Sequence, residues 1–499
     1  MNNNCQKNPG MFLFYRQQTI FFLSLAVFLV FALSCANRTS PLPTDPDPVP
    51  PVNPGGSGKS DIVSWITSPD QMMFFKKQST ELNFSSSSNY FPSILVDTTQ
   101  TFQTMDGFGF AMTGGSAMLI NQLTATTKEA LLNELFRSDS TFIGTNYLRI
   151  SIGASDLDAN VFSYDDMPAN QTDPLLANFS LDPDKQHLIP ILKSVVAIHP
   201  GIKILGSPWS APAWMKTNQS TVGGSLKPEY YAVYANYLVK YIQAMAAQGI
   251  RIDAITPQNE PLNPHNNPSM TMSATEQADF IKNHLGPAFQ ASGISAKIIV
   301  WDHNCDVPSY PLTILSDAGA SKYVDGSAFH LYAGDISALS QVHNAYPDKH
   351  VYFTEQWVGG PGNFAGDLKW HVKNLIIGAP RNWSKNVIEW NLASDPNYYP
   401  HTVGGCSTCM GALTIGTTVI RNVAYYIIAH ASKFVSTGSV RIASNNVGTL
   451  SNVAFKTPTG KKVLVVLNEG STVQKFNIQF NEMIATAELA GGAVGTYVW

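Results

Sequence analysis

The chain alternates short apolar runs with longer amphipathic segments from about residue 105 onward. Each apolar run has the length and composition of a buried strand, and the segments between the runs repeat apolar residues with helical spacing. The predicted strands cover 107–113, 146–152, 202–206, 254–256, 297–301, 326–330, 351–354 and 387–390; the clearest predicted helices cover 127–136, 228–247, 274–291 and 419–434. Eight such alternations predict an α/β fold, a (β/α)8 barrel over residues 104–435.

An open, doubly wound sheet is the alternative for this alternation. Such a sheet is expected to carry a glycine-rich phosphate loop after its first strand. The only candidate, Gly107-Phe108-Gly109, does not continue as that motif. The pattern therefore favours the barrel.

The pattern changes to short strands and turns at both ends of the predicted barrel. After residue 436 the predicted strands cover 441–442, 447–450, 453–456, 461–467, 472–478 and 496–499, with turn signals between them. Residues 61–103 also have a strand-like pattern, clearest at 94–97. We expect residues 61–103 and 436–499 to form one β-sandwich that flanks the barrel.

The N-terminal segment has the features of an export signal. Lys7 and Arg16 precede an apolar stretch over 20–33, which is short for a membrane span and ends at Cys35. This ending resembles the lipobox of bacterial lipoproteins, in which the cysteine is lipidated after cleavage. The segment is thus predicted to be a signal peptide over 1–34, and the Pro- and Gly-rich stretch over 35–60 a tether. An ordinary signal peptide with an incidental cysteine is the alternative.

This N-terminus predicts an exported bacterial lipoprotein anchored in the outer membrane or at the cell surface. Net charge is −4, and only 13% of the residues are charged. Because no basic run is present, nucleic-acid binding has no support. A monomer is the default expectation for a tethered protein.

Cys406 and Cys409 form a Cys-Ser-Thr-Cys pair. In an exported chain, two cysteines this close favour a small disulfide loop. A metal site would need two further ligands, for which His401 is the one obvious candidate. A redox motif would need a thioredoxin-like context, which the surrounding sequence lacks.

Polar and aromatic residues gather at the C-terminal ends of the predicted strands, where barrels of this kind build their sites. Glu260 and Glu355 both follow such strands. Two carboxyl groups at strand ends suit hydrolysis of a glycosidic bond, in which one protonates the leaving oxygen and the other attacks the sugar carbon. A single glutamate there is more often a salt-bridged acid, but two together favour chemistry.

The motifs around these glutamates resemble glycoside hydrolase family 30, which includes glucosylceramidases, β-1,6-glucanases and some xylanases. They are Gly107-Phe108-Gly109-Phe110, residues 207–216 (SPWSAPAWMK), residues 256–261 (TPQNEP), Phe353-Thr354-Glu355 and Trp390-Asn391. Together they extend over most of residues 100–435. The resemblance implies a (β/α)8 barrel with a side β-sandwich, retention of the anomeric configuration and no metal or organic cofactor.

The resemblance also implies a role for single residues. It makes Glu260 the acid/base and Glu355 the nucleophile. Arg149 is a candidate donor that keeps the pKa of Glu355 low, whereas the charge on Glu355 should raise the pKa of Glu260. The expected substrate contacts are Asn259 (to the sugar 2-hydroxyl), Trp209, Trp390 and Tyr332 (to the nucleophile), with His330 and Asp156 as weaker candidates. Each has a purely structural alternative, such as core packing for the tryptophans.

Gly114 narrows the expected substrate. Glucosylceramidase-like members carry an Asp at this place, whereas residues 111–116 here read Ala-Met-Thr-Gly-Gly-Ser. This resembles the endo-β-1,6-glucanase subfamily, so internal cleavage of a β-1,6-glucan such as pustulan is the first expectation. An exo-acting β-glucosidase, glucosylceramidase or xylanase of the same family is the alternative within the class. A surface glycan-binding lipoprotein without activity is the alternative outside it.

Overall fold

The structure, a computed structural model, describes residues 60–499. The predicted signal peptide over 1–34, the lipidation site Cys35 and nearly all of the predicted tether lie outside the described residues. Within residues 60–499, no helix has the length and apolar character needed to cross a membrane.

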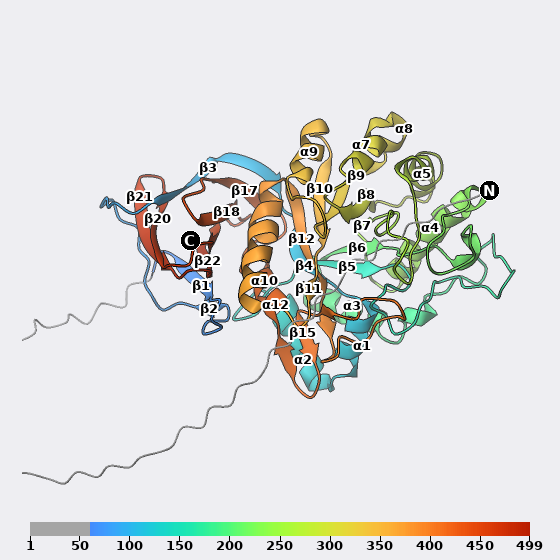
Figure 1. The fold of residues 1–499 in the computed structure, drawn as a ribbon, viewed down its shortest axis with the longest axis horizontal. Helices are drawn as coiled ribbons and strands as arrows, with labels where there is room; N and C mark the ends of the chain where they lie inside the picture. The colour runs from blue at the N-terminus through green and yellow to red at the C-terminus, as the bar shows by residue number, and fades with distance from the viewer. Residues whose placement is uncertain (1–59) are drawn as a thin grey trace, which may run out of the picture. The chain divides into compact units, whose positions relative to one another are not determined.

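Eight parallel strands close into a barrel, as the alternating pattern predicts (Figure 1). Around the barrel the order of neighbours is β10-β12-β4-β5-β6-β7-β8-β9. The strands are β4 (Gly107–Ala111), β5 (Tyr147–Ser151), β6 (Lys203–Ser207), β7 (Ala254–Ile255), β8 (Lys297–Asn304), β9 (Val324–His330), β10 (His350–Glu355) and β12 (Ser384–Asn391). Each coincides with one of the eight predicted apolar runs.

The barrel interior is filled by side chains, not open. Seven of the eight strands contribute one residue each to a separate buried cluster, made of Tyr147, Leu205, Ala254, Ile299, Ala328, Tyr352 and Ile388. Residues that alternate with these point outward to the helices. Because the strands are covered on both faces, they are apolar along almost their whole length, which is why they are easy to find in the sequence.

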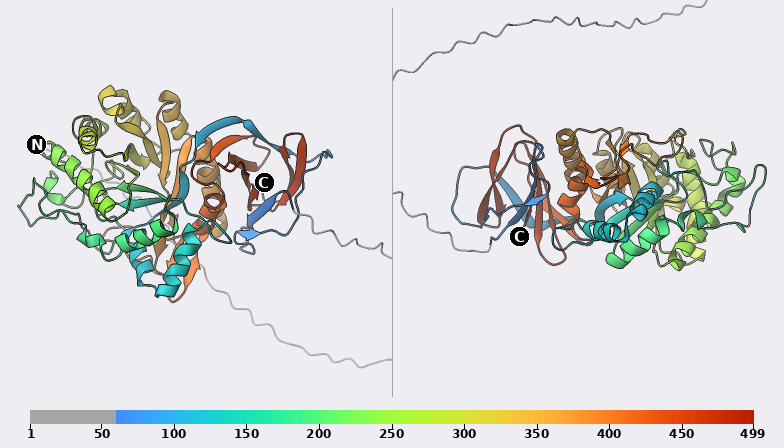
Figure 2. Two further views of the ribbon diagram at one scale, coloured as in Figure 1. Left: turned by 180° about the vertical axis from the view of Figure 1, so that it is seen from behind. Right: turned by 90° about the horizontal axis from the view of Figure 1, so that it is seen from below.

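Helices surround the barrel (Figures 1 and 2). They are α1 (Gly114–Gln122), α2 (Ala125–Phe136), α3 (Leu188–Ile198), α4 (Tyr231–Ala247), α5 (Ala274–Phe280), α6 (Gly286–Ala291), α7 (Ser309–Ser316), α8 (Ala318–Ser321), α9 (Ala338–Ala345), α10 (Phe364–His371), α11 (Ala379–Arg381) and α12 (Val423–Ser432). A π-helical turn, Ile281–Leu285, joins α5 to α6, so the predicted helix over 274–291 is unbroken. The helix predicted over 419–434 begins later than predicted, at Val423. Its first residues form strand β16 (Val419–Arg421), whose side chains are β-branched or long.

Strands from both ends of the described chain share one nine-stranded sheet, in the order β2-β1-β22-β19-β18-β17-β3-β20-β21. Figure 1 shows the blue N-terminal and red C-terminal strands side by side. These strands are β1 (Val63–Thr67), β2 (Lys76–Lys77), β3 (Ser93–Thr104), β17 (Val440–Ser444), β18 (Leu450–Lys456), β19 (Lys462–Asn468), β20 (Gln474–Phe480), β21 (Met483–Leu489) and β22 (Val494–Val498). The sheet has its own core, which includes Ile94, Leu464 and Phe476. The prediction that the two ends build one β-domain beside the barrel is confirmed.

Two details of the predicted β-domain are wrong. Residues 447–450 are not a strand: Val447 and Leu450 pair with each other across the turn that leads into β18. Strand β21 (Met483–Leu489) was not predicted, because its alanines and charged residue give it low β-propensity. Its residues alternate between buried and exposed once β20 pairs with it.

Helix α12 fastens the β-domain to the barrel. The ring of His430 is fully buried between the two domains, 2.9 Å from the Thr496 hydroxyl and 2.8 Å from the Thr67 hydroxyl. One barrel helix thus contacts both β1 and β22. Four small strands extend the loops above the barrel: β11 (Val358–Gly359) with β14 (Cys409–Met410), and β13 (Ala393–Ser394) with β15 (Leu413–Ile415), which also pairs with β16.

Candidate active site

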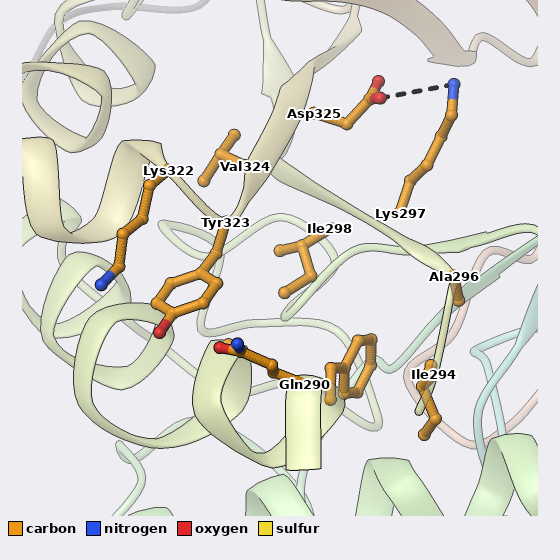
Figure 3. A pocket seen from close by; sticks show the side chains of 11 residues that line it. Gln290, Ile294, Ala296, Lys297, Ile298, Lys322, Tyr323, Val324 and Asp325 are labelled. Atoms are coloured by element: carbon orange, nitrogen blue, oxygen red, sulfur yellow. Dashed lines mark ion pairs between the residues drawn. The ribbon is translucent and has the colours of Figure 1, made fainter. Parts of the chain in front are cut away.

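Among the hollows of the described residues, two of nearly equal volume lie at opposite ends of the barrel strands. One of about 470 Å3 contains Lys297 and Asp325, which come from the N-terminal ends of β8 and β9 (Figure 3). Their charges are paired, with Lys297 Nζ 3.4 Å from Asp325 Oδ1. The other, of about 480 Å3, contains both Glu260 and Glu355 and lies at the C-terminal strand ends. Since volume does not separate them, the carboxyl pair identifies the second hollow as the catalytic cavity.

The cavity is built by residues from many strand ends and loops. Its lining consists of Asp156, Trp209, Glu260, Leu262, Asn263, Pro264, His265, Asn266, His303, Asn304, Tyr332, Glu355, Trp357, Trp390, Cys406 and Cys409. Both glutamates are buried, and an oxygen of each lies within 4.8 Å of the other. This separation suits a nucleophile and an acid/base that act on one sugar carbon with retention, for which about 5–5.5 Å is typical.

The backbone that carries Glu260 is strained. Glu260 has φ +42°, and Trp301 and Asp302, on the neighbouring strand, have φ +76° and +62°. Residues other than glycine rarely adopt this region, and such strain is characteristic of functional sites. The Glu260 N–H donates to the Asp302 carbonyl at 3.0 Å, so the two strained segments hold each other in place.

Arg149 connects the nucleophile to the rest of the site. Its side chain is fully buried and donates to Glu355 Oε2 at 2.6 Å and to Asp302 Oδ2 at 2.8 Å. It also donates to Asn259 Oδ1 at 2.7 Å. The Asn259 oxygen is thereby occupied, which leaves its amide nitrogen as the donor for a ligand. Arg149 lies behind the residues that line the cavity, whereas Asn259, next to Glu260, keeps a small exposed fraction.

Asp302 was not selected as a site residue from the sequence, yet it has the densest set of contacts here. Its carboxylate accepts hydrogen bonds from Arg149 and from three hydroxyl groups, those of Ser207, Thr256 and Thr354, at 2.7–2.8 Å. With so many donors, and Arg149 foremost among them, the pKa of Asp302 lies well below its ordinary value although burial opposes this. Its position at the polar end of β8, in Trp301-Asp302-His303-Asn304, was the signal in the sequence.

His330 is fully buried between two carboxylates. Its Nδ1 is 3.1 Å from Glu260 Oε1, and its Nε2 is 3.1 Å from Asp302 Oδ1. The sequence analysis placed this histidine on the substrate; the structure places it behind the lining, in contact with the acid/base candidate. Glu260 Oε2 accepts a second hydrogen bond, from Asn263 Nδ2 at 2.8 Å.

The expected order of the two glutamate pKa values is wrong for the protein without substrate. Burial alone would raise the pKa of Glu260, but the hydrogen bond and charge of His330 outweigh burial and lower this pKa to about 2. For Glu355 burial prevails and raises the pKa, against the opposing charges of His330 and Arg149. The sequence argument considered the donor Arg149 and the charge of Glu355 on Glu260, but it did not include His330, whose Nδ1 lies 3.1 Å from Glu260 and 3.8 Å from Glu355.

Tyr332 and the two tryptophans complete the walls. The Tyr332 hydroxyl donates to Glu355 Oε1 at 2.9 Å, the contact expected from the sequence. Trp209 and Trp390 are almost fully buried and stack on each other, with ring centroids 5.3 Å apart. The Arg149 guanidinium lies 4.8 Å from the Trp209 ring. The tryptophans therefore form an aromatic wall whose faces are already partly covered, not an open stacking platform.

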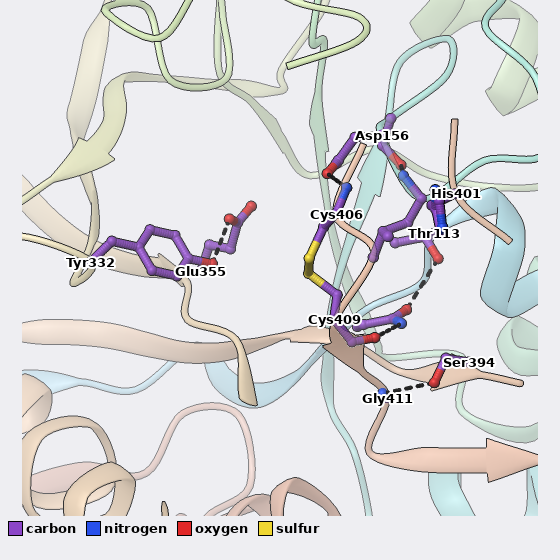
Figure 4. Close-up of a disulfide and its surroundings, with 12 residues drawn as sticks. Thr113, Asp156, Tyr332, Glu355, Ser394, His401, Cys406, Cys409 and Gly411 are labelled. Carbon is purple, nitrogen blue, oxygen red and sulfur yellow. Dashed lines mark hydrogen bonds between the residues drawn. A yellow bond between two sulfur atoms is a disulfide. The ribbon is translucent and has the colours of Figure 1, made fainter. Parts of the chain in front are cut away.

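A disulfide-closed loop forms another wall of the cavity (Figure 4). Cys406 and Cys409 are bonded to each other. The Cys406 N–H donates to Asp156 Oδ2 at 3.2 Å, and the Thr402 N–H donates to the Asp156 carbonyl at 2.9 Å. Burial, then the charge of Glu355, raises the pKa of Asp156 to about 7. A carboxyl group is thus presented to the cavity by Asp156.

Gly114 does not line the cavity. A Cβ atom at this position would lie 1.7 Å from Asp158 Oδ1, so the residue is a glycine because the Asp158 carboxylate fills that space. The substrate argument drawn from Gly114 therefore has no counterpart in the cavity lining, where Asp156 supplies the acidic group. Asn263 and Trp357 also line the cavity and were not recognised in the sequence.

Glu260, His330 and Glu355 bring three ligand atoms within 4.8 Å of one another, a spacing that would also admit a metal ion. Each of these side chains already has protein partners, namely Asn263, Asp302 and Arg149 respectively. Arg149 therefore supplies a positive charge to Glu355 within the protein itself.

Comparisons with known proteins agree with this geometry. The model of the glycosyl hydrolase family 30 TIM-barrel domain matches residues 105–435, and that of the family's beta sandwich domain matches residues 438–497. An endo-1,6-beta-D-glucanase of Neurospora crassa is 38% identical, over 79% of this chain and 82% of that protein. The lysosomal acid glucosylceramidase of Mus musculus is 30% identical, over 80% and 81%. The solved structure of the endo-beta1,6-glucanase BT3312 superimposes with a TM-score of 0.83 and 35% identity, over 88% of this chain and 99% of that one.

Proposed function

The chain belongs to glycosyl hydrolase family 30, and on this premise we propose that it cleaves β-1,6-glucan chains internally, with retention of the anomeric configuration. One observation carries the proposal: Glu260 and Glu355 meet within 4.8 Å at the C-terminal end of a closed barrel. The β-1,6 linkage of the proposed substrate is supported by the relatives. The endo-1,6-β-glucanases are 34–38% identical to this chain, more than the glucosylceramidases at 28–32%.

Each residue has a distinct role in the proposed reaction. Glu355 attacks the anomeric carbon while Glu260 protonates the leaving glycosidic oxygen; water then opens the glycosyl ester with Glu260 as base. Arg149 and Tyr332 each bind one oxygen of Glu355 and so fix the direction of its attack. Asn259 donates its amide to the sugar 2-hydroxyl, and Asp156 accepts from a further hydroxyl. Trp209 and Trp390 exclude water from one side of the cavity.

The products formed from pustulan test this function. We expect the purified protein to release a ladder of β-1,6-linked oligomers, because an endo-acting enzyme cuts within the chain. Chromatography of early time points measures it, and the first products should have the β-configuration by proton NMR. A matched Glu355→Gln preparation should release none.

Other product patterns would point to the alternatives. Glucose as the sole product would indicate exo action, and turnover of glucosylceramide or xylan without pustulan would indicate another substrate of the family. Binding of pustulan without turnover of any β-glucan would indicate a glycan-binding protein. Each of these three results would contradict the proposed function.

We also propose that Cys35 is lipidated and tethers the enzyme to the membrane of a bacterial cell, as its lipobox-like setting suggests. In a bacterial host, the wild-type chain should fractionate with membranes and incorporate labelled palmitate, whereas Cys35→Ser should not incorporate it. Cys305→Ser is the matched control, since this cysteine is buried in the barrel domain. Equal labelling of wild type and Cys35→Ser would contradict the anchor.

A further inference from the structure

The two edges of the nine-stranded sheet leave a hollow between them. The edge strands, β2 and β21, are not paired with each other in the described chain, and a backbone bridge between Ser85 and Ile484 spans the gap at one place. A hollow of about 390 Å3 opens between the same two edges. Its volume is typical of sites for small ligands, about 300–1,000 Å3. The lining of this hollow, the sheet-edge groove, includes Ser64, Gln78, Thr80, Phe91, Thr486 and Tyr497.

Neutral polar groups are prominent in the sheet-edge groove. Hydroxyl or amide side chains come from Ser64, Gln78, Thr80 and Thr486. The charged residues of the lining are Lys475 and Glu488, whose Nζ and Oε2 atoms lie 3.5 Å apart, so their charges offset each other. A lining of this kind favours a neutral ligand with many hydroxyl groups over an anion or a cation.

An exposed aromatic ring faces the groove from a well-anchored loop. Phe91 lines the groove and is 41% exposed, and the preceding Tyr90 is fully exposed. The amides of Asn89 and Asn477 exchange hydrogen bonds of 3.0 and 2.7 Å, and Asn89 Oδ1 also accepts from the Phe91 N–H at 3.0 Å. Because Asn477 is buried in β20, the backbone that carries Phe91 is held before a ligand arrives, which lowers the entropy cost of binding.

Tyr497 contributes a buried hydroxyl that has no hydrogen-bond partner within residues 60–499. This tyrosine lines the groove and is only 1% exposed. A buried hydroxyl without a partner costs free energy, and nearly all such groups in proteins are satisfied. A hydroxyl group of a bound ligand would give Tyr497 the missing partner.

From these features we infer that the sheet-edge groove is a second glycan site, which holds a neutral β-glucan chain on the β-domain while the catalytic cavity cuts it. The apolar face of a sugar ring packs against Phe91, and the sugar hydroxyls meet the hydroxyl and amide groups of the lining. The inference rests on the proposed function for the identity of its ligand. A polymer that is cut internally has room for both sites, and binding at one raises its effective concentration at the other.

Electrophoresis through native gels that contain pustulan tests the groove. Glu355→Gln is the common background, so that the polysaccharide is not digested. We expect Phe91→Ala in this background to bind pustulan at least about fivefold more weakly, a loss typical of a truncated aromatic anchor. Phe74→Ala is the matched control, because Phe74 has a similar exposure, 44%, and does not line the groove. Equal retardation of the two variants would overturn the inference.

Tyr497→Phe covers the case in which the alanine variant does not fold. It removes only the unpartnered oxygen, so the midpoint of urea unfolding should not fall. Retardation by pustulan should weaken by about threefold or more, the range of one lost hydrogen bond. A lower midpoint with unchanged retardation would show that the hydroxyl serves the fold alone, which would contradict the inference.

Substrate length separates the groove from the catalytic cavity. In the protein with Glu355 intact, Phe91→Ala should raise KM for pustulan by about fivefold and leave kcat unchanged, the pattern of lost uniform binding. Hydrolysis of 4-nitrophenyl β-gentiobioside should keep the wild-type rate, because a substrate of two sugars occupies the catalytic cavity alone. A raised KM on both substrates would contradict a separate site.

The failure of this inference and the failure of the proposed function are distinguishable. If the wild type releases no oligomers from pustulan, the proposed function fails. The difference in retardation between Phe91→Ala and Phe74→Ala does not depend on turnover, so it still reports whether the groove binds the polysaccharide.

Discussion

Replacing Glu355 with glutamine should abolish glucan hydrolysis, with kcat reduced by about 10^4-fold or more, as is typical when a covalent nucleophile is removed. The amide of glutamine is nearly the same size as the carboxylate and can still contact Tyr332, but it cannot form the glycosyl ester. The measurement is the initial rate of reducing-end release from pustulan. Glu129→Gln, on the exposed side of α2, controls for the exchange itself and should have the wild-type rate.

Azide distinguishes the two glutamates. With an activated aryl glycoside, azide added to Glu355→Ala should attack the sugar directly and give the α-glycosyl azide. In Glu260→Ala, azide should instead open the enzyme ester and give the β-anomer. Activity of Glu355→Gln within tenfold of wild type, or exchanged azide anomers, would show that the assignment of the two roles is incorrect.

Arg149→Met should cause a large loss of stability. Methionine nearly fills the space of the arginine chain but leaves Asp302 and Glu355 buried without their shared cation. Breaking a buried ion pair in this way typically costs about 3–5 kcal/mol. The midpoint of urea unfolding should fall accordingly, and hydrolysis should be lost because the nucleophile is no longer held.

Arg251→Met is the matched control for this change. Arg251 also pairs with an aspartate, Asp253, at 2.7 Å, but its side chain is 67% exposed. Exposed pairs contribute about 0–1 kcal/mol, so its unfolding midpoint should hardly move. Similar midpoints for the two variants would mean that the buried network around Arg149 does not stabilise the fold.

The sequence predicts the barrel and its two glutamates well, and the physical reason is local. A strand covered on both faces has to be apolar along its length, and the polar residue at its end stands out, as Glu355 does after Val351-Tyr352-Phe353. The joining of residues 61–103 with the C-terminal strands was predictable because both ends changed from helical spacing to strand spacing together.

What the sequence could not supply is which side chains face one another across the barrel. Asp302 and His330 lie on the neighbouring strands β8 and β9, and Glu260 follows strand β7. His330 contacts both carboxyl groups. No spacing in the sequence shows that an imidazole lies between two carboxylates, so the contact of His330 with Glu260 could not be predicted. Gly114 shows the same limit, because its packing partner Asp158 follows a different strand.

The pairing of β1 with β22 affects how the chain reaches its fold. Val63 and Val498 are neighbours in that ladder, although they lie 435 positions apart in the sequence. Contacts of such high sequence separation form late, because closing a long loop costs entropy before pairing rewards it. During synthesis, β1 therefore has only the two-residue strand β2 to pair with until the final strand emerges from the ribosome. We expect nascent chains to acquire a protected barrel first, and the β-domain to become resistant to protease only after the last strand is released.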